Sequence, residues 1–124
     1  MVNVAIYGAG AAGIVIGSRL HKGGANVTLI ARDQTYDTIK QEGAIVSNGN
    51  GEEETFNFAV TDQPKDINNP DYILIATKAY AIPSIAHNIN TMVGDKTTVI
   101  PLCNGVPWWF FQKHEGLLSG KSFD

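Results

Sequence analysis

The stretch VAIYGAGAAGIVIG (Val4–Gly17) decides how the chain begins to fold. A short β-branched run that opens at Val2 stops at Gly8, and apolar residues then recur at helical spacing until the Gly23-Gly24 pair. This pattern predicts a strand, a tight turn and a helix that ends at a glycine.

The alternation of strands and helices continues along the chain. Further strands are predicted at Val27–Ala31, Asp71–Thr77 and Thr97–Leu102, and further helices at Thr35–Gln41 and Ala81–Thr91. The last two strands are apolar on both faces, as expected when helices cover both sides of a parallel sheet. Pro101 lacks an amide donor and should stand at the end of its strand or beside a bulge.

Two short strand-like segments, Ala44–Ser47 and Thr55–Val60, interrupt this alternation. They flank Asn48-Gly49-Asn50-Gly51, and Asn-Gly is a strong hairpin signal. We interpret them as a hairpin insertion rather than another crossover. The whole pattern predicts one α/β domain, residues 1–124, with a doubly wound, mostly parallel sheet and a small β-hairpin.

Composition excludes several classes of function. The chain has 124 residues, a net charge of −3 and one cysteine, so we expect no nucleic-acid partner and a reducing, cytoplasmic setting. No apolar run reaches the roughly 18 residues of a membrane span, so no membrane partner is expected. His21, His87 and His114 share no metal-ligand spacing, and we predict no metal site.

The glycines of the first turn have separable roles. Gly8, Gly10 and Gly13 match G-x-G-x-x-G between a strand and a helix, the Rossmann fingerprint for dinucleotides. The first glycine allows the tight turn, the second leaves room for a pyrophosphate, and the third lets helix and strand pack closely. A glycine-rich turn can also be a mere tight corner, but the context favours nucleotide binding. The predicted cofactor contacts in this turn are Gly8, Ala9, Gly10, Ala11, Ala12 and Gly13.

The residue at the end of the second strand bears on the choice of cofactor. An acidic residue there binds the ribose 2′-hydroxyl of NAD, whereas an arginine accommodates the 2′-phosphate of NADP. The chain has Arg32 at this point, which favours NADP. Asp33 follows directly, so a shift of one residue would reverse the preference.

Polar residues follow two other predicted strands. Thr77 and Lys78 come after one strand, and Asn104 and Gly105 come after the next. The carboxyl ends of parallel strands share one edge, where ligands bind. A surface lysine and a turn asparagine would be ordinary alternatives, yet together they could position a 2-ketoacid or the nicotinamide ribose.

The chain resembles the N-terminal domain of ketopantoate reductase (2-dehydropantoate 2-reductase). The matching segments are Ile6–Gly13, Leu29–Asp33, Ile75–Tyr80 and Leu102–Phe111. The resemblance implies NADPH-dependent reduction of ketopantoate in pantothenate biosynthesis, an oxidoreductase reaction. It also implies that Arg32 meets the 2′-phosphate, and that Lys78 and Asn104 line the cofactor and substrate cleft.

Members of that family resemble two-domain enzymes in which a helical C-terminal domain supplies the general acid. The chain ends at Asp124 without a match to that domain. We therefore expect an isolated or truncated NADP-binding domain that is inactive alone. One alternative is a free-standing NADP-sensing or protein-docking module. A methyltransferase that uses S-adenosylmethionine would prefer an acidic residue at Arg32, so it ranks last.

Four consecutive aromatic residues, Trp108–Phe111, cannot all face one side of a helix. Core packing would bury them by using several elements. Alternatively, part of the cluster forms a docking face for a second domain or for another copy of the chain, which would give a homodimer.

Overall fold

The computed structural model of the protein describes residues 1–78 and 81–102. The elements, in chain order, are β1 (Asn3–Tyr7), α1 (Ala11–Lys22), β2 (Asn26–Ile30), α2 (Asp33–Glu42), β3 (Ala44–Ser47), β4 (Glu53–Phe56), β5 (Ala59–Thr61), the 3-10 helix η1 (Pro64–Asp66), β6 (Tyr72–Ile75), α3 (Ile82–Met92) and β7 (Thr98–Pro101). These elements confirm the predicted α/β fold and its hairpin.

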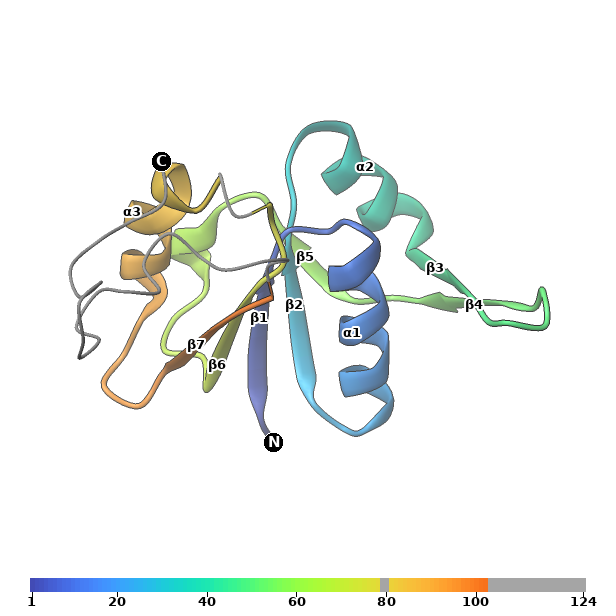
Figure 1. Ribbon diagram of the computed structural model, residues 1–124, viewed down its shortest axis with the longest axis horizontal. Coiled ribbons are helices and arrows are strands. Elements are labelled where there is room, and N and C mark those ends of the chain that lie inside the picture. Colours follow the sequence, from blue (N-terminus) through green and yellow to red (C-terminus); the bar gives the residue numbers. More distant parts are fainter. Residues whose placement is uncertain (79–80, 103–124) are drawn as a thin grey trace, which may run out of the picture.

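The main sheet has the strand order β5-β2-β1-β6-β7, and all of its strand pairs are parallel. The chain builds outward from β1 to β5 on one side and then returns to add β6 and β7 on the other. α1 and α2 lie on one side of the sheet and α3 lies on the opposite side (Figure 1). The reversal between β1 and β6 is the switch point at which ligands bind in open parallel sheets.

The core consists of two clusters, one on each face of the sheet. In β1, Val4 and Ile6 pack in the cluster beneath α1, whereas Ala5 belongs to the cluster beneath α3. Ile73 and Leu74 of β6 likewise face opposite sides, and both are buried. The predicted burial of this strand on both faces is therefore confirmed.

The segment after the hairpin differs from the prediction. The expected strand Thr55–Val60 is divided: β4 pairs antiparallel with β3, whereas β5 pairs parallel with β2 at the edge of the main sheet. The predicted hairpin insertion is therefore confirmed, but the exclusion of another crossover was wrong, because the hairpin lies within a crossover from β2 to β5. The exposed Asn57 and the buried Phe58 lie between the two strands.

Two physical facts explain this division. Phe56 and Phe58 are both buried, and their rings stack with centroids 5.6 Å apart, so the apolar alternation continues while the backbone changes partner. β5 also gives hydrogen-bond partners to the outer edge of β2, which would otherwise carry unpaired backbone groups. The Ala31 N–H, for example, donates to the Thr61 carbonyl oxygen at an N···O distance of 3.0 Å.

The expectation for β7 was also wrong in part. Pro101 ends the strand as predicted, but β7 pairs only with β6 in the described residues. Val99 and Ile100 are 39% and 37% exposed, so the strand is not covered on both faces there. Apolar composition on both faces predicted a central strand, whereas β7 is an edge strand of the described sheet.

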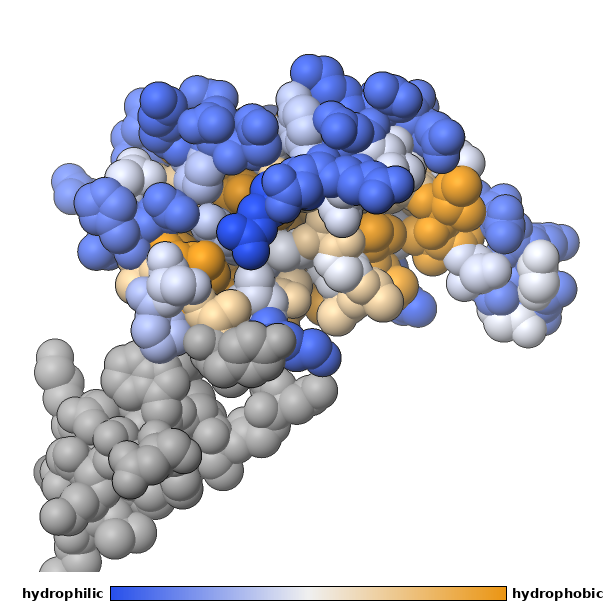
Figure 2. All heavy atoms as spheres, turned by 90° about the horizontal axis from the view of Figure 1, so that it is seen from above, coloured by the Kyte–Doolittle hydropathy of each residue, from blue (hydrophilic) through white to orange (hydrophobic). Residues whose placement is uncertain are grey.

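The β3–β4 hairpin projects from the body of the molecule, and hydrophilic to neutral residues cover its tip (Figures 1 and 2). Its strand β4 is tied to α1 by a salt bridge in which Lys22 Nζ and Glu54 Oε1 are 3.0 Å apart, between exposed side chains. His21 of α1 also meets the Phe58 ring edge-on, at 5.5 Å between centroids. Within the described ranges, no helix has both the length and the apolar character needed to cross a bilayer.

Candidate nucleotide-binding site

A cavity of about 550 Å³ lies at the carboxyl edge of the sheet. The turn after β1 contributes Gly8, Ala9 and Gly10, the end of β2 contributes Arg32, and β6 leads into it at Thr77. The strand ends that the sequence predicted to meet at one edge therefore do meet there, as far as the described residues extend.

Close packing of α1 on β1 shapes the inner wall of this cavity. Gly8 has a φ of +107°, which favours glycine, and its N–H donates to the Ile30 carbonyl oxygen at 3.1 Å. A Cβ at Gly13 would overlap the Gly8 carbonyl oxygen, and a Cβ at Gly17 would lie 3.1 Å from Ile6 Cδ1. Glycine is therefore required where the helix crosses the strand, as predicted.

The N-terminus of α1 faces the open part of the turn. Gly10 caps this helix through its backbone only, since no side chain forms a capping hydrogen bond. A Cβ at Gly10 would meet no protein atom within 4 Å. The first amides of a helix have no partner within the helix, and the helix dipole makes this end positive. The turn thus offers main-chain donors and free volume to an anionic ligand.

The structure distinguishes the two charged residues at the end of β2. Arg32 lines the cavity and is the N-cap residue of α2. Asp33 begins that helix with a φ of +56° and is not a lining residue. The positive φ turns the chain sharply between the two positions. Arg32 is thus part of the cavity lining, whereas Asp33 begins the helix and does not line the cavity.

The remaining predicted site residues have separate outcomes. Lys78 follows Thr77 directly and is exposed, but it does not line the cavity. Ala11 and Ala12 are exposed at the start of α1, next to the lining residue Gly10. Asn104, Gly105 and the Trp108–Phe111 cluster lie outside the described residues, so their predicted roles stay predictions.

Two parts of the cavity were missed by the sequence analysis. Tyr7 and Asn88 line it and are joined by a hydrogen bond in which Asn88 Nδ2 donates to Tyr7 Oη at 3.0 Å. Asp62 lines it from the connection after β5. Helical spacing could have placed Asn88 on α3, but Asp62 becomes a strand-end residue only once β5 is recognised as part of the parallel sheet.

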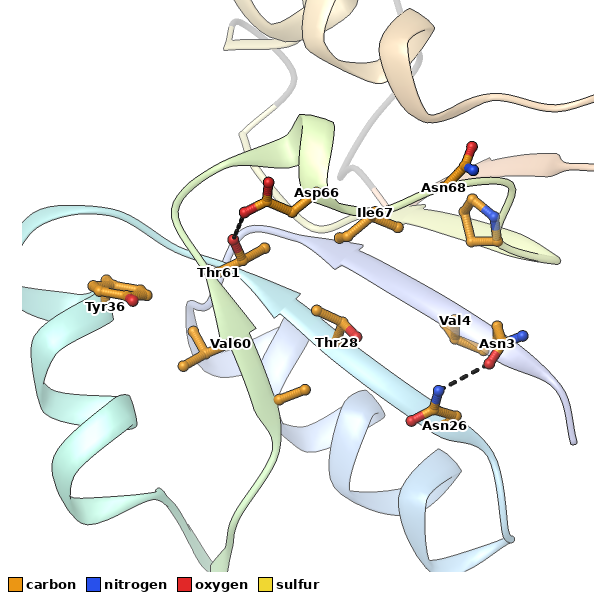
Figure 3. Close-up of a pocket in the computed structure, with 12 residues that line it drawn as sticks. Asn3, Val4, Asn26, Thr28, Tyr36, Val60, Thr61, Asp66, Ile67 and Asn68 are labelled. Carbon is orange, nitrogen blue, oxygen red and sulfur yellow. Dashed lines mark hydrogen bonds between the residues drawn. The ribbon is translucent and has the colours of Figure 1, made fainter.

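A second hollow, of about 600 Å³, lies on the same face as α3 beside β5, away from the glycine turn. Its polar side chains largely bond to one another: Asn26 Nδ2 donates to Asn3 Oδ1 at 2.9 Å, and Thr61 Oγ1 donates to Asp66 Oδ2 at 3.4 Å (Figure 3). In the described part of the chain, no group of three or more His, Cys, Asp or Glu side chains could hold a metal ion.

The glycine turn, the parallel strand order and the cavity at the switch point together define a Rossmann-type domain. The family model described as "Ketopantoate reductase PanE/ApbA" matches residues 4–107. The chain therefore belongs to the ketopantoate reductase family, whose members are NAD(P)-dependent oxidoreductases.

Individual relatives agree with this assignment. The 2-dehydropantoate 2-reductase of Mesorhizobium japonicum is 29% identical over 120 residues, which are 96% of this chain and 36% of the relative. A crystal structure of a protein from Ralstonia solanacearum MolK2 has a TM-score of 0.89 and 32% identity, covering 98% of this chain and 37% of that chain. D-mandelate dehydrogenase, solved with NADH and anilino(oxo)acetate, has a TM-score of 0.74 and 32% identity, covering 83% of this chain and 34% of that chain. The chain thus spans about a third of the length of these relatives.

The packing of the turn predicts that substitution of two of its glycines changes stability to different extents. Gly13→Ala should lower the free energy of unfolding by about 1–3 kcal/mol, because the new methyl group overlaps the Gly8 carbonyl. Gly10→Ala should change it by less than about 1 kcal/mol, because the methyl group enters open space. Urea denaturation of both variants measures this difference. Equal stability of the two variants would contradict the described packing.

Proposed function

We propose that the chain binds NADP(H) across the carboxyl edge of its sheet and serves as the nucleotide-binding part of a 2-ketoacid reductase. The observation that carries this proposal is that one cavity is lined both by the bare glycine turn, where the diphosphate would lie, and by Arg32, where the adenosine ribose would lie. Either feature alone would be compatible with an ordinary turn or a surface charge.

The residues fit the two charged parts of the cofactor. In the proposal, the amides at the start of α1 bind the pyrophosphate. Because Gly10 has no side chain, the pyrophosphate can come close to these amides. Arg32 pairs with the 2′-phosphate, because a guanidinium presents several donors in the geometry that phosphate accepts. The choice of NADP over NAD is part of the proposal, since one relative was solved with NADH.

For the substrate we propose a small 2-ketoacid, with ketopantoate as the first candidate. The bound cofactor would supply a hydride to the carbonyl carbon, and the carbonyl oxygen would need a proton from an acid. Lys78, next to the cavity at the end of β6, and Asn104 are the proposed positioning residues for the ketoacid and the nicotinamide ribose. The proposal gives no residue of this chain the role of general acid, and we propose that reduction requires a proton donor beyond this chain.

The cofactor assignment predicts a selective effect of Arg32→Ala. The wild-type chain should bind NADPH more tightly than NADH. The variant should lose about tenfold to a hundredfold of its NADPH affinity, because a charge-assisted hydrogen bond contributes about 1.5–3 kcal/mol, while NADH affinity changes little. Calorimetric titration of the wild type and the variant with each cofactor measures the NADPH affinity and the NADH affinity. Arg19→Ala, which removes an exposed arginine from the far end of α1, is the matched control and should leave both affinities unchanged.

The assignment as part of a reductase predicts no ketopantoate-dependent oxidation of NADPH by this chain alone. Adding a separately produced C-terminal part of a family relative should give measurable turnover, followed by the absorbance of the reduced nicotinamide. Turnover by the chain alone would contradict the proposed need for further residues. NADPH binding without turnover in the mixture would instead favour the alternative, a sensing or docking module.

A further inference from the structure

Asp62 stands beside Arg32 at the edge of the sheet, although thirty positions of sequence separate them. The last residue pair between β2 and β5 is Ile30↔Thr61, and the Ala31 N–H still donates to the Thr61 carbonyl oxygen. Asp62 is the next residue after that pair. Since neighbouring strands are about 4.8 Å apart, the backbones that carry the two charges are close neighbours. Both residues line the same cavity.

Both charges are available to a ligand in the described part of the chain. No salt bridge or side-chain hydrogen bond there involves Arg32 or Asp62. Asp66, four residues further on, behaves differently, because its carboxylate accepts a hydrogen bond from Thr61 and lines the second hollow (Figure 3). Asp62 is thus the acidic residue of this connection that faces the nucleotide cavity.

The negative charge of Asp62 also reaches α2. The pKa of Lys40 is raised from its ordinary value, first by its hydrogen bond to Tyr36 and by the charge of that phenol, and further by the carboxylates of Asp62 and Asp37. α2 begins next to Arg32, at the end of the cavity where the proposed 2′-phosphate would lie. Lys40 lies in the last turn of α2, so this effect places the Asp62 charge near the helix but not at its start; the two charges are brought to one site by the cavity that Arg32 and Asp62 both line.

We propose that Asp62 is a second specificity-determining residue of this cavity, which opposes Arg32 and narrows the preference for NADPH over NADH. The inference rests on the proposed function and deepens it. A carboxylate repels a 2′-phosphate, but it can accept a hydrogen bond from an unphosphorylated ribose, which is the role that an acidic residue at the end of β2 has in NAD-binding domains. Here the basic and the acidic determinants come from successive strands of the sheet.

Asp62→Asn tests this inference by removing the charge while keeping nearly the same shape. At low ionic strength it should raise the ratio of NADPH affinity to NADH affinity at least about fivefold, because a unit charge within several ångströms of a phosphate interacts strongly near a protein surface. The gain should shrink in high salt, which screens exposed charges. A change that merely loosens the fold would weaken both cofactors alike and would not depend on salt in this way.

Asp95→Asn is the matched control, because it removes the same charge from an exposed position between α3 and β7, at the opposite edge of the sheet. It should leave the affinity ratio unchanged. Asp62→Ser, compared by thermal unfolding, provides a second variant if the asparagine variant folds poorly.

An unchanged ratio in both Asp62 variants, or an equal change for the two cofactors, would overturn the inference while leaving the proposed function intact. Failure of the wild-type chain to bind either cofactor would instead contradict the proposed function itself.

Discussion

The close approach of α1 to β1 is the constraint on which the rest of the structure depends. At Gly13 there is no space for a Cβ beside the Gly8 carbonyl, and at Gly17 the helix lies against Ile6. This contact buries the face of β1 beneath α1 and fixes the helix N-terminus at the carboxyl end of the strand. At Gly10, by contrast, a Cβ would meet no protein atom within 4 Å, so the turn is open beside this packed contact.

Much of this arrangement was predictable because it depends on local chemistry. The glycine spacing fixed the first strand, turn and helix, and the run Ile73–Ile75 predicted a strand buried on both faces, as observed. The position of Arg32 also followed from the length of β2. Only the structure, however, shows that Arg32 lines the cavity and Asp33 does not. The sharp turn at the positive φ of Asp33 cannot be predicted from hydrophobic periodicity.

The features that sequence analysis missed depend on which strands become neighbours. Phe56 and Phe58 continue an apolar alternation across a change of partner, so the pattern suggested one strand where there are two. Asp62 was overlooked for that reason, since its place at the cavity requires β5 in the parallel sheet. Tyr7 and Asn88 meet only because α3 packs on the face that Tyr7 points toward.

In the proposal, recognition of the cofactor is divided between two parts of the cavity. Main-chain donors at the glycine turn would contact the diphosphate, which all dinucleotides share, so they would contribute affinity without selectivity. Side chains from β2 and from the connection after β5 would act on the ribose, where NAD and NADP differ. Selectivity could then change through one or two exposed residues, without change to the packed contact between helix and strand.

A crystal structure of the chain with NADPH tests the central claim most directly. The account predicts diphosphate oxygens at hydrogen-bond distance, about 2.7–3.2 Å, from backbone nitrogens at the start of α1, with the 2′-phosphate beside Arg32. A cofactor bound elsewhere, or one whose diphosphate does not contact the turn between Gly8 and Gly13, would contradict it.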